Sequence, residues 1–265
     1  MPCPAPGGAP WRGSVLILTA TLTLTTSQPA RADNTISTIE RVKGSVVAVG
    51  TFERTRAPAF QFRATGFAVG DGSLVATNVH ALPVTLDSEH RETLVVLIPA
   101  PGQEPQLREA RELVVDTGSD LALLKIDGPP LPALKLGGFE AVREGQRVLF
   151  TGFPIGSVLG IFAATHRGMI AAITPIAIPP PVAAQLDARV ARRLATGSFP
   201  VFQLDATAYP GNSGSPVYDP ESGEVLGIIN MVFVKGTKEA ALTQPSGITY
   251  AIPASHLQAL LAKTH

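Results

Sequence analysis

Short runs of β-branched and apolar residues, separated by turn residues, recur along the whole sequence and constrain its fold more than any other feature. Many short strands at such spacing are typical of a barrel or a sandwich. We therefore expect an all-β chain with two β units of about a hundred residues each. The runs are 45–50, 66–69, 74–77, 93–98, 112–116 and 121–126, then, after a turn-rich join at 137–145, 147–152, 168–173, 201–204, 216–218, 225–234 and 247–252. Helical periodicity is confined to 36–42, 182–195 and a closing run that contains Leu257, Leu260 and Leu261.

The first 32 residues have the pattern of an export signal. Arg12 precedes an apolar stretch from Val15 to Leu24, and Ala30-Arg31-Ala32 offers small residues for cleavage, so that Asp33 would begin the mature chain. A membrane anchor is the alternative, but a stretch of about ten residues is too short to cross roughly 30 Å of hydrocarbon. We expect cleavage, no membrane span in the mature chain, and a periplasmic or secreted protein.

Composition excludes several functions. The whole chain has 21 basic and 21 acidic residues and 45% hydrophobic residues, which argues against disorder and against binding nucleic acid through a basic surface. Residues 1–32 contain two arginines and no acid, so 33–265 carries 19 basic and 21 acidic residues, a net charge of −2. Cys3 is the one cysteine and lies in the signal. The mature chain therefore has no disulfide, no thiolate nucleophile and no cysteine-ligated metal, and we expect neither a metal nor a cofactor.

A serine between glycines is the first candidate for chemistry. It is Ser213, in the string Asp205-Ala206-Thr207-Ala208-Tyr209-Pro210-Gly211-Asn212-Ser213-Gly214-Ser215-Pro216. Gly211 and Gly214 allow a tight turn and close approach of a substrate. If the amides of Gly211 and Ser213 point inward together, they form an oxyanion hole. A polar β-turn is the alternative interpretation. A nucleophile elbow does not fit, because Ser215 stands where that motif requires glycine.

A serine nucleophile needs a base and a carboxylate that orients the base. His80, near the end of the apolar run 74–82, would be held rigidly at a barrel rim, as a general base must be. His166 is the rival, whereas His90, His256 and His265 are most simply solvated. The carboxylate candidate is Asp120, immediately before the apolar run 121–126, with Asp116 as the competitor.

The order His80, Asp120, Ser213 and the surrounding segments resemble the trypsin-like serine proteases, and within them the HtrA/Deg type. The resemblance covers nearly the whole mature chain. Its segments are Gly44-Ser45-Val46-Val47, Thr65-Gly66-Phe67-Ala68-Val69, Ala76-Thr77-Asn78-Val79-His80, Ser119-Asp120-Leu121-Ala122-Leu123-Leu124, Gly152-Phe153-Pro154-Ile155-Gly156, Gly168-Met169-Ile170, Gln203-Leu204-Asp205-Ala206, Gly211-Asn212-Ser213-Gly214 and Gly247-Ile248-Thr249-Tyr250-Ala251-Ile252-Pro253.

This resemblance implies a fold, a domain division and a reaction. The fold is two six-stranded antiparallel β-barrels with a short C-terminal helix and the catalytic groups in the cleft between the barrels. The N-terminal barrel would span 33–140 and carry His80 and Asp120, and the C-terminal barrel would span 141–265 and carry Ser213. The reaction is peptide-bond cleavage through a triad of His80, Asp120 and Ser213 and an acyl-enzyme, with Gly211 and Ser213 as the oxyanion hole.

Departures from the family pattern bear on specificity. Ser215-Pro216 is similar to the glutamyl endopeptidases, but Ile229 stands where their pocket carries a histidine, so glutamate specificity is not supported. Thr207 replaces the aspartate of a trypsin-type pocket, which leaves small or medium apolar residues as the expected preference. We expect Thr207, Tyr209, Ile229, Asn230 and Met231 to contact the substrate, the last three as an edge to which a peptide adds as a strand.

Two further expectations concern regulation. Asn212 is neutral where the digestive relatives have the aspartate that a new N-terminus pairs with, so no zymogen switch of that kind is expected. Twelve residues follow Pro253, enough for one helix, so we expect a protease domain without a PDZ domain. The segment 175–200 is interpreted either as a lid or as a surface helix packed on the second barrel.

The resulting hypothesis is an exported serine endopeptidase that acts on proteins or peptides. Two alternative functions are also compatible with the sequence. One is a non-cleaving peptide-binding or chaperone-like module on the same fold, and the other is a secreted esterase that uses the same triad.

Overall fold

The computed structural model describes residues 1–3, 7, 32–100, 102–175, 199–230 and 247–264. Residues 1–31 and 32–265 form separate units, and the fold described below is that of the second. The predicted helical segment 182–195 lies outside the described residues. Within the described residues, no helix has both the length and the apolar character needed to span a membrane.

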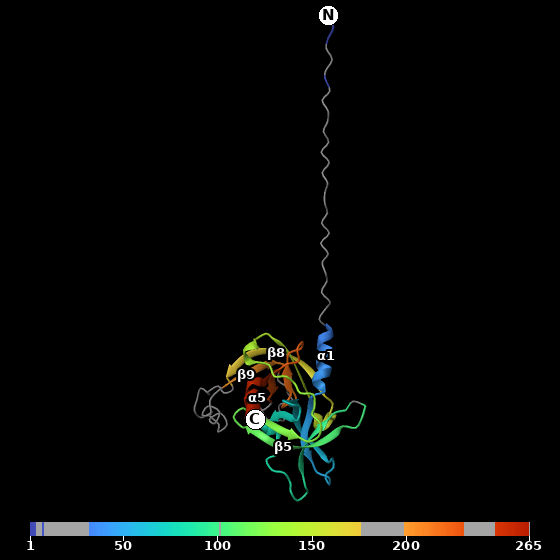
Figure 1. Cartoon of the computed structure of the whole chain (residues 1–265), viewed down its shortest axis with the longest axis vertical. Helices are drawn as coiled ribbons and strands as arrows, with labels where there is room; N and C mark the ends of the chain where they lie inside the picture. Colours follow the sequence, from blue (N-terminus) through green and yellow to red (C-terminus); the bar gives the residue numbers. More distant parts are fainter. Residues whose placement is uncertain (4–6, 8–31, 101, 176–198, 231–246, 265) are drawn as a thin grey trace. The chain divides into compact units, whose positions relative to one another are not determined.

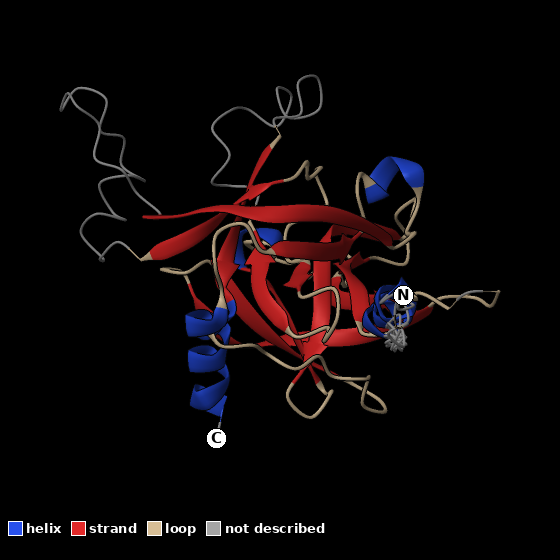
Figure 2. Cartoon of the chain, turned by 90° about the horizontal axis from the view of Figure 1, so that it is seen from above, coloured by secondary structure: helices blue, strands red, loops and turns tan. Residues whose placement is uncertain are grey.

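Twelve strands form two closed antiparallel barrels, as the sequence predicts (Figures 1 and 2). The strand order is β1-β2-β3-β6-β5-β4 in the first barrel and β10-β11-β12-β9-β8-β7 in the second. The first barrel contains β1 (Val46–Phe52), β2 (Phe60–Val69), β3 (Leu74–Asn78), β4 (Thr93–Ile98), β5 (Gln106–Asp116) and β6 (Leu121–Ile126). The second contains β7 (Arg147–Gly152), β8 (Ala164–Pro175), β9 (Pro200–Asp205), β10 (Pro216–Tyr218), β11 (Val225–Ile229) and β12 (Ile248–Pro253).

The helices are short and lie around the barrels (Figure 2). They are α1 (Ala32–Lys43), α2 (Gly156–Leu159) and α5 (Ala254–Leu261), together with the 3-10 turns η1 (Val79–Ala81), η2 (Phe139–Ala141) and η5 (Ala262–Thr264). The predicted C-terminal helix is therefore confirmed as α5, which buries Leu257 and Leu260. Helix α1 is tied to the second barrel, because Arg41 and Thr38 donate hydrogen bonds to the carbonyl oxygens of Ser222 and Glu221.

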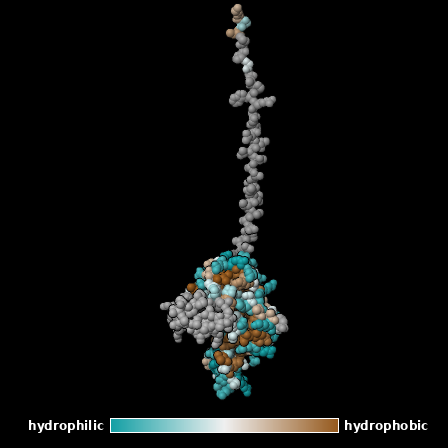
Figure 3. Space-filling view, turned by 90° about the vertical axis from the view of Figure 1, so that its left-hand side faces the viewer, coloured by the Kyte–Doolittle hydropathy of each residue, from teal (hydrophilic) through white to brown (hydrophobic). Residues whose placement is uncertain are grey.

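Three apolar clusters hold the fold together. One fills the first barrel around Val47, Val75 and Leu124, and one fills the second barrel around Phe150 and Phe202. The third lies between the barrels and combines side chains of both with those of α5, including Phe67, Leu121, Phe153, Tyr218, Ile228 and Leu257. This shared cluster fixes the two barrels against each other. On the face seen in Figure 3, hydrophobic residues form separate patches among hydrophilic ones.

Candidate active site

His80 lies in η1, directly after strand β3. The turn is held from two sides. Asn78 and Val79 donate from the side-chain amide and the backbone amide to the carbonyl oxygen of Asp120, at 3.0 and 3.2 Å. The guanidinium of Arg63 donates to the carbonyl oxygens of Ala81 and Leu82, at 2.6 and 3.2 Å. The imidazole is therefore carried on a turn with fixed ends, as a general base requires.

Asp120 ends the turn before β6 and contacts His80 through both carboxylate oxygens. Oδ1 accepts from the His80 backbone amide at 2.9 Å, and Oδ2 lies 2.6 Å from His80 Nδ1. A third donor, Asn230 Nδ2, lies 2.7 Å from the same Oδ2. The backbone of Asp120 has φ +56°, a left-handed conformation that aspartate adopts more readily than most residues.

Two opposing effects set the pKa of Asp120. Burial raises the pKa, but the hydrogen bonds and charge of His80, together with the hydrogen bond from Asn230, outweigh burial and hold the pKa below its usual value. Asp120 is therefore ionised at neutral pH and only accepts hydrogen bonds. In a neutral imidazole, the proton that faces Asp120 is therefore on Nδ1, and Nε2 is the acceptor that faces Ser213.

The competitor Asp116 has a different role. Its carboxylate accepts from the Gly118 backbone amide at 3.0 Å and from the Ser119 hydroxyl at 2.8 Å, which closes the turn between β5 and β6. Burial raises the pKa of Asp116, and these hydrogen bonds outweigh it, so that the pKa lies below its usual value. Asp116 thus shapes the turn that presents Asp120.

Ser213 lies on the loop between β9 and β10, and its Oγ is 3.0 Å from His80 Nε2. Its carbonyl oxygen accepts from the Thr65 amide at 2.9 Å, which joins the loop to the first barrel. Gly214 has φ +83°, and a Cβ there would clash with the Thr65 carbonyl oxygen. Gly211 has φ +100°, and a Cβ there would clash with the Phe153 carbonyl oxygen. Both positions therefore require glycine.

The backbone on either side of the Gly211 amide is fixed by hydrogen bonds to neighbouring carbonyl oxygens. The Ile155 amide donates to the Pro210 oxygen at 2.7 Å, and the Thr65 hydroxyl donates to the Gly211 oxygen at 2.7 Å. Within the described residues, the amides of Gly211 and Ser213 have no hydrogen-bond acceptor. Two unpaired amides beside a serine hydroxyl are the arrangement that stabilises an oxyanion.

A family model described as a trypsin-like peptidase domain matches residues 64–228, which include all three of these side chains. The chain belongs to this family.

A DegP-like protein of Pseudomonas fluorescens, described as a probable periplasmic serine endoprotease, is 30% identical over 190 residues, which are 71% of this chain and 32% of the relative. The serine protease HTR4 of Bos taurus is 29% identical over 239 residues, which are 86% of this chain and 41% of the relative. The chain thus spans about a third of the length of the DegP-like relatives it matches.

Solved structures show the same fold at lower identity. The Rv3671c protease of M. tuberculosis in its active form aligns with a TM-score of 0.61 at 20% identity, over 95% of this chain and 94% of that chain. The HtrA-type protease AlgWS227A with a tripeptide aligns with a TM-score of 0.60 at 22% identity, over 86% of this chain and 62% of that chain. Both alignments place the chain in the trypsin-like fold.

The residues predicted to contact substrate in this member of the trypsin-like peptidase family occupy different places. Thr207 and Tyr209 are partly exposed on the loop that leads to Ser213. Ile229 is fully buried in the core of the second barrel, and Asn230 is fully buried with its amide on Asp120. Met231 lies outside the described residues. Contact of these residues with substrate remains a prediction.

The rival base His166 lies on β8, and the hydrogen bond of the Ser213 hydroxyl is to His80 instead. Its ring stacks on Phe150 with centroids 4.8 Å apart and is 6.2 Å from the ring of Tyr209. Burial lowers the pKa of His166, and its buried Nε2 has no hydrogen-bond partner in the described part of the chain. His90 pairs with Asp87 at 2.8 Å, and His256 lies against Phe199 with ring centroids 4.2 Å apart.

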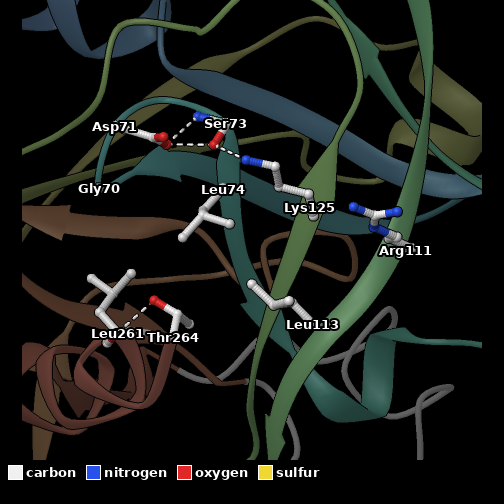
Figure 4. A pocket seen from close by; sticks show the side chains of 9 residues that line it. All are labelled: Gly70, Asp71, Ser73, Leu74, Arg111, Leu113, Lys125, Leu261 and Thr264. Carbon is white, nitrogen blue, oxygen red and sulfur yellow. Dashed lines mark hydrogen bonds between the residues drawn. The ribbon is translucent and has the colours of Figure 1, made fainter.

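A cavity of about 530 Å³ lies on the first barrel beside the C-terminal helix, and none of His80, Asp120 and Ser213 lines it (Figure 4). Asp71, Ser73 and Lys125 form a hydrogen-bonded chain at one side, and Leu74, Leu113 and Leu261 form an apolar side. Hydrogen bonds from the Ser73 side chain and backbone lower the pKa of Asp71. Over the residues that the structure describes, no group of three or more metal-binding side chains comes together.

Sequence reasoning missed four residues that support the site. They are Arg63, Thr65, Asn78 and Asn230, each of which contacts a part of the site from a distant point in the sequence. Thr65 stood in a recognised motif, but nothing in the sequence assigned its hydroxyl to the Gly211 carbonyl oxygen. Asn230 was expected to contact substrate, and its contact with Asp120 had no sequence signal.

Proposed function

We propose that this chain is an exported serine endopeptidase with a catalytic triad of His80, Asp120 and Ser213. One observation carries the proposal: Ser213 Oγ, His80 and Asp120 form a continuous hydrogen-bonded line of 3.0 and 2.6 Å, beside two backbone amides that have no acceptor among the described residues. Membership in the trypsin-like peptidase family supports the same conclusion.

The reaction follows from this arrangement. His80 Nε2 takes the Ser213 proton as Oγ attacks the carbonyl carbon of the scissile bond, and the amides of Gly211 and Ser213 bind the oxyanion. The imidazolium, which Asp120 stabilises, then gives the proton to the leaving amine and leaves an acyl-enzyme. Water repeats the attack with the same base, which releases the acid product and restores the Ser213 hydroxyl.

The same proposal includes the division of the chain, its location and its substrates. Residues 1–32 are a signal peptide, 33–140 the barrel unit that carries His80 and Asp120, and 141–265 the unit that carries Ser213. The mature protein acts in the periplasm or outside the cell on proteins or peptides, with small or medium apolar residues before the cut. Peptides add as a strand along the main chain that starts at Ile229 and Asn230. N-terminal sequencing of the exported protein should begin at Asp33.

A fluorophosphonate probe tests the nucleophile directly. The mature protein should be labelled and should cleave casein, and Ser213→Ala should abolish both. Ser215→Ala is the matched control, because Ser215 is a buried neighbour whose hydroxyl has no partner within the described residues. Absence of labelling in the wild type, or labelling that survives Ser213→Ala, contradicts the proposal and favours a non-cleaving binding module. A short ester offered beside casein separates a peptidase from an esterase.

A further inference from the structure

Arg63 is the extra residue of a β-bulge in strand β2. Val49 pairs with Ala64 and the next residue, Gly50, pairs with Phe62, so that Arg63 has no partner on β1. Bulges next to active sites redirect side chains. Here the two residues at the bulge support different parts of the site. Phe62 packs edge to face on Phe153, with ring centroids 6.1 Å apart, and Arg63 reaches the turn that carries His80.

The guanidinium of Arg63 is anchored on one edge and free on the other. Nε donates to the Ala81 carbonyl oxygen at 2.6 Å, and Nη2 donates to the Leu82 carbonyl oxygen at 3.2 Å. Within the described residues Nη1 has no acceptor, and the Arg63 side chain is exposed. Two carbonyl groups orient the guanidinium without neutralising its charge, so Arg63 presents a fixed positive charge beside His80.

Three carboxylates of the first barrel have ion-pair partners of their own. Glu92 and Glu53 pair with Arg56, at 2.7 and 3.6 Å, and Asp87 pairs with His90. No carboxylate among the described residues lies within ion-pair distance of Arg63. Its charge is therefore available to a carboxylate from outside the chain, and a guanidinium with a free edge binds carboxylates well.

The proposed mechanism indicates which side of the scissile bond is nearer to Arg63. The leaving amine receives its proton from His80 Nε2, so the residues on the C-terminal side of the scissile bond start within hydrogen-bonding distance of that nitrogen. Ala81 and Leu82 follow His80 directly and hold the guanidinium. Arg63 also precedes Thr65 by two residues, and the Thr65 amide contacts the Ser213 carbonyl oxygen. The leaving half of a bound substrate would therefore begin next to the turn that Arg63 contacts.

We propose that Arg63 is a specificity residue that favours an acidic side chain among the first three residues after the scissile bond. The inference rests on the proposed peptidase activity and adds a substrate class to it. The carboxylate of the leaving half pairs with the free Nη1 edge, while the Nε edge stays on the His80 turn. Because the pair is exposed to solvent, we expect a preference of about two- to fivefold.

Quenched fluorogenic peptides test this proposal. A peptide that the wild type cleaves at one mapped bond is resynthesised with Glu, Gln or Lys at each of the first three positions after that bond, and kcat/KM is measured for each. At one of these positions the wild type should cleave the Glu peptide about two- to fivefold faster than the Gln peptide. Arg63→Gln should bring this ratio to about one, and Arg63→Glu should favour the Lys peptide. Arg147→Gln removes the same charge from the exposed start of β7 and should leave the ratio unchanged.

The outcomes separate this inference from the proposed function. Equal rates for Glu and Gln peptides in the wild type overturn the specificity role alone, since the enzyme still cleaves. An Arg63→Gln variant that slows all peptides by the same factor and keeps the ratio also overturns it, because Arg63 then only positions the His80 turn. A protein that the fluorophosphonate probe does not label and that cleaves no peptide overturns both.

Discussion

The carboxylate of Asp120 joins several polar groups of the candidate site. Its carboxylate accepts from the backbone and the ring of His80 and from the amide of Asn230. These contacts orient the imidazole and assign its tautomer. In the proposed triad, the imidazole beside the Ser213 hydroxyl is thus oriented by a side chain that does not itself react.

Replacing Asp120 with asparagine tests this control. The amide keeps the shape of the side chain but presents a donor to His80, which favours the wrong tautomer, and kcat should fall by about 10⁴-fold. The measurement is kcat at saturating peptide, with circular dichroism to check the fold. Asn230→Ala should cost much less, because it removes one of the hydrogen bonds to Asp120 and leaves the tautomer unchanged. A larger loss in Asn230→Ala than in Asp120→Asn would refute the assignment.

Glu92 gives a pH-dependent prediction away from the site. Hydrogen bonds from Thr51, from Arg56 and from the Asp87 amide lower the pKa of Glu92 from 4.5 to about 2. A carboxyl whose pKa is lower in the folded than in the unfolded state stabilises the fold above the unfolded pKa, and this contribution is lost as the pH falls from about 4.5 to about 2. Glu92→Gln should therefore reduce the free energy of unfolding at pH 7, and the difference from wild type should shrink below pH 4.5. Urea titrations at pH 7, 5 and 3.5 measure it, and a constant difference would contradict the pairing.

At the scale of elements, the loop between β7 and β8 supports the nucleophile loop. Ile155 lies at the start of α2 with φ +48°, a left-handed conformation that is unfavourable for a β-branched residue. Its amide donates to the Pro210 carbonyl oxygen at 2.7 Å and so fixes the peptide that contains the Gly211 amide. This backbone strain thus lies next to the predicted oxyanion hole.

Two substitutions of Ile155 should affect activity differently. Ile155→Gly keeps the N–H group and relieves the left-handed strain, so activity should be kept and the thermal midpoint should not fall by more than a few degrees. Ile155→Pro removes the donor and cannot adopt a positive φ, so kcat should fall by about 100-fold or more. Steady-state kinetics of both variants, with labelling by the fluorophosphonate probe, provide the comparison. Full activity in Ile155→Pro would show that the Pro210 contact does not set the oxyanion hole.

The sequence predicts buried strands well and long, exposed ones poorly. The run 93–98 coincides with β4 and 121–126 with β6, whose residues are largely buried. The run 112–116 gives only the end of β5, because that strand is half exposed and its charged residues hide the alternation. The run 66–69 likewise misses the first half of β2, where the bulge at Arg63 interrupts the alternation of buried and exposed residues.

The residues of the candidate site also divide into those that the local sequence predicts and those that it does not. His80, Asp120 and Ser213 adjoin buried strands or glycine turns, so their local sequence singles them out. The contacts from Arg63 to Ala81 and from Asn230 to Asp120 depend on how distant segments meet, which no local pattern encodes. The positive φ of Ile155 runs against the preference of its residue type and could not be predicted from it.

At the scale of the whole molecule, polar contacts join the two barrels near the site. His80 and Asp120 belong to the first barrel and Ser213 to the second, so their distances depend on how the barrels pack. The Thr65 hydroxyl is one of the polar groups that join them. It donates to the Gly211 carbonyl oxygen at 2.7 Å and accepts from the Phe153 amide at 3.1 Å.

Thr65→Val therefore tests the contact between the barrels. Valine has nearly the same shape, but it leaves the Gly211 oxygen and the Phe153 amide without a partner, which should lower the free energy of unfolding by about 1–3 kcal/mol. Because the carbonyl group of Gly211 is then no longer held, while the Ile155 contact remains, kcat should also fall by about 10- to 100-fold. Thr65→Ser should keep both the stability and kcat.

Thr151→Val is the control, because Thr151 is also fully buried and forms hydrogen bonds with Tyr218 and Thr165 but with no predicted site residue. It should lose stability and keep kcat; an equal loss of kcat in both valine variants would mean that activity follows overall stability, and not the Thr65 contact.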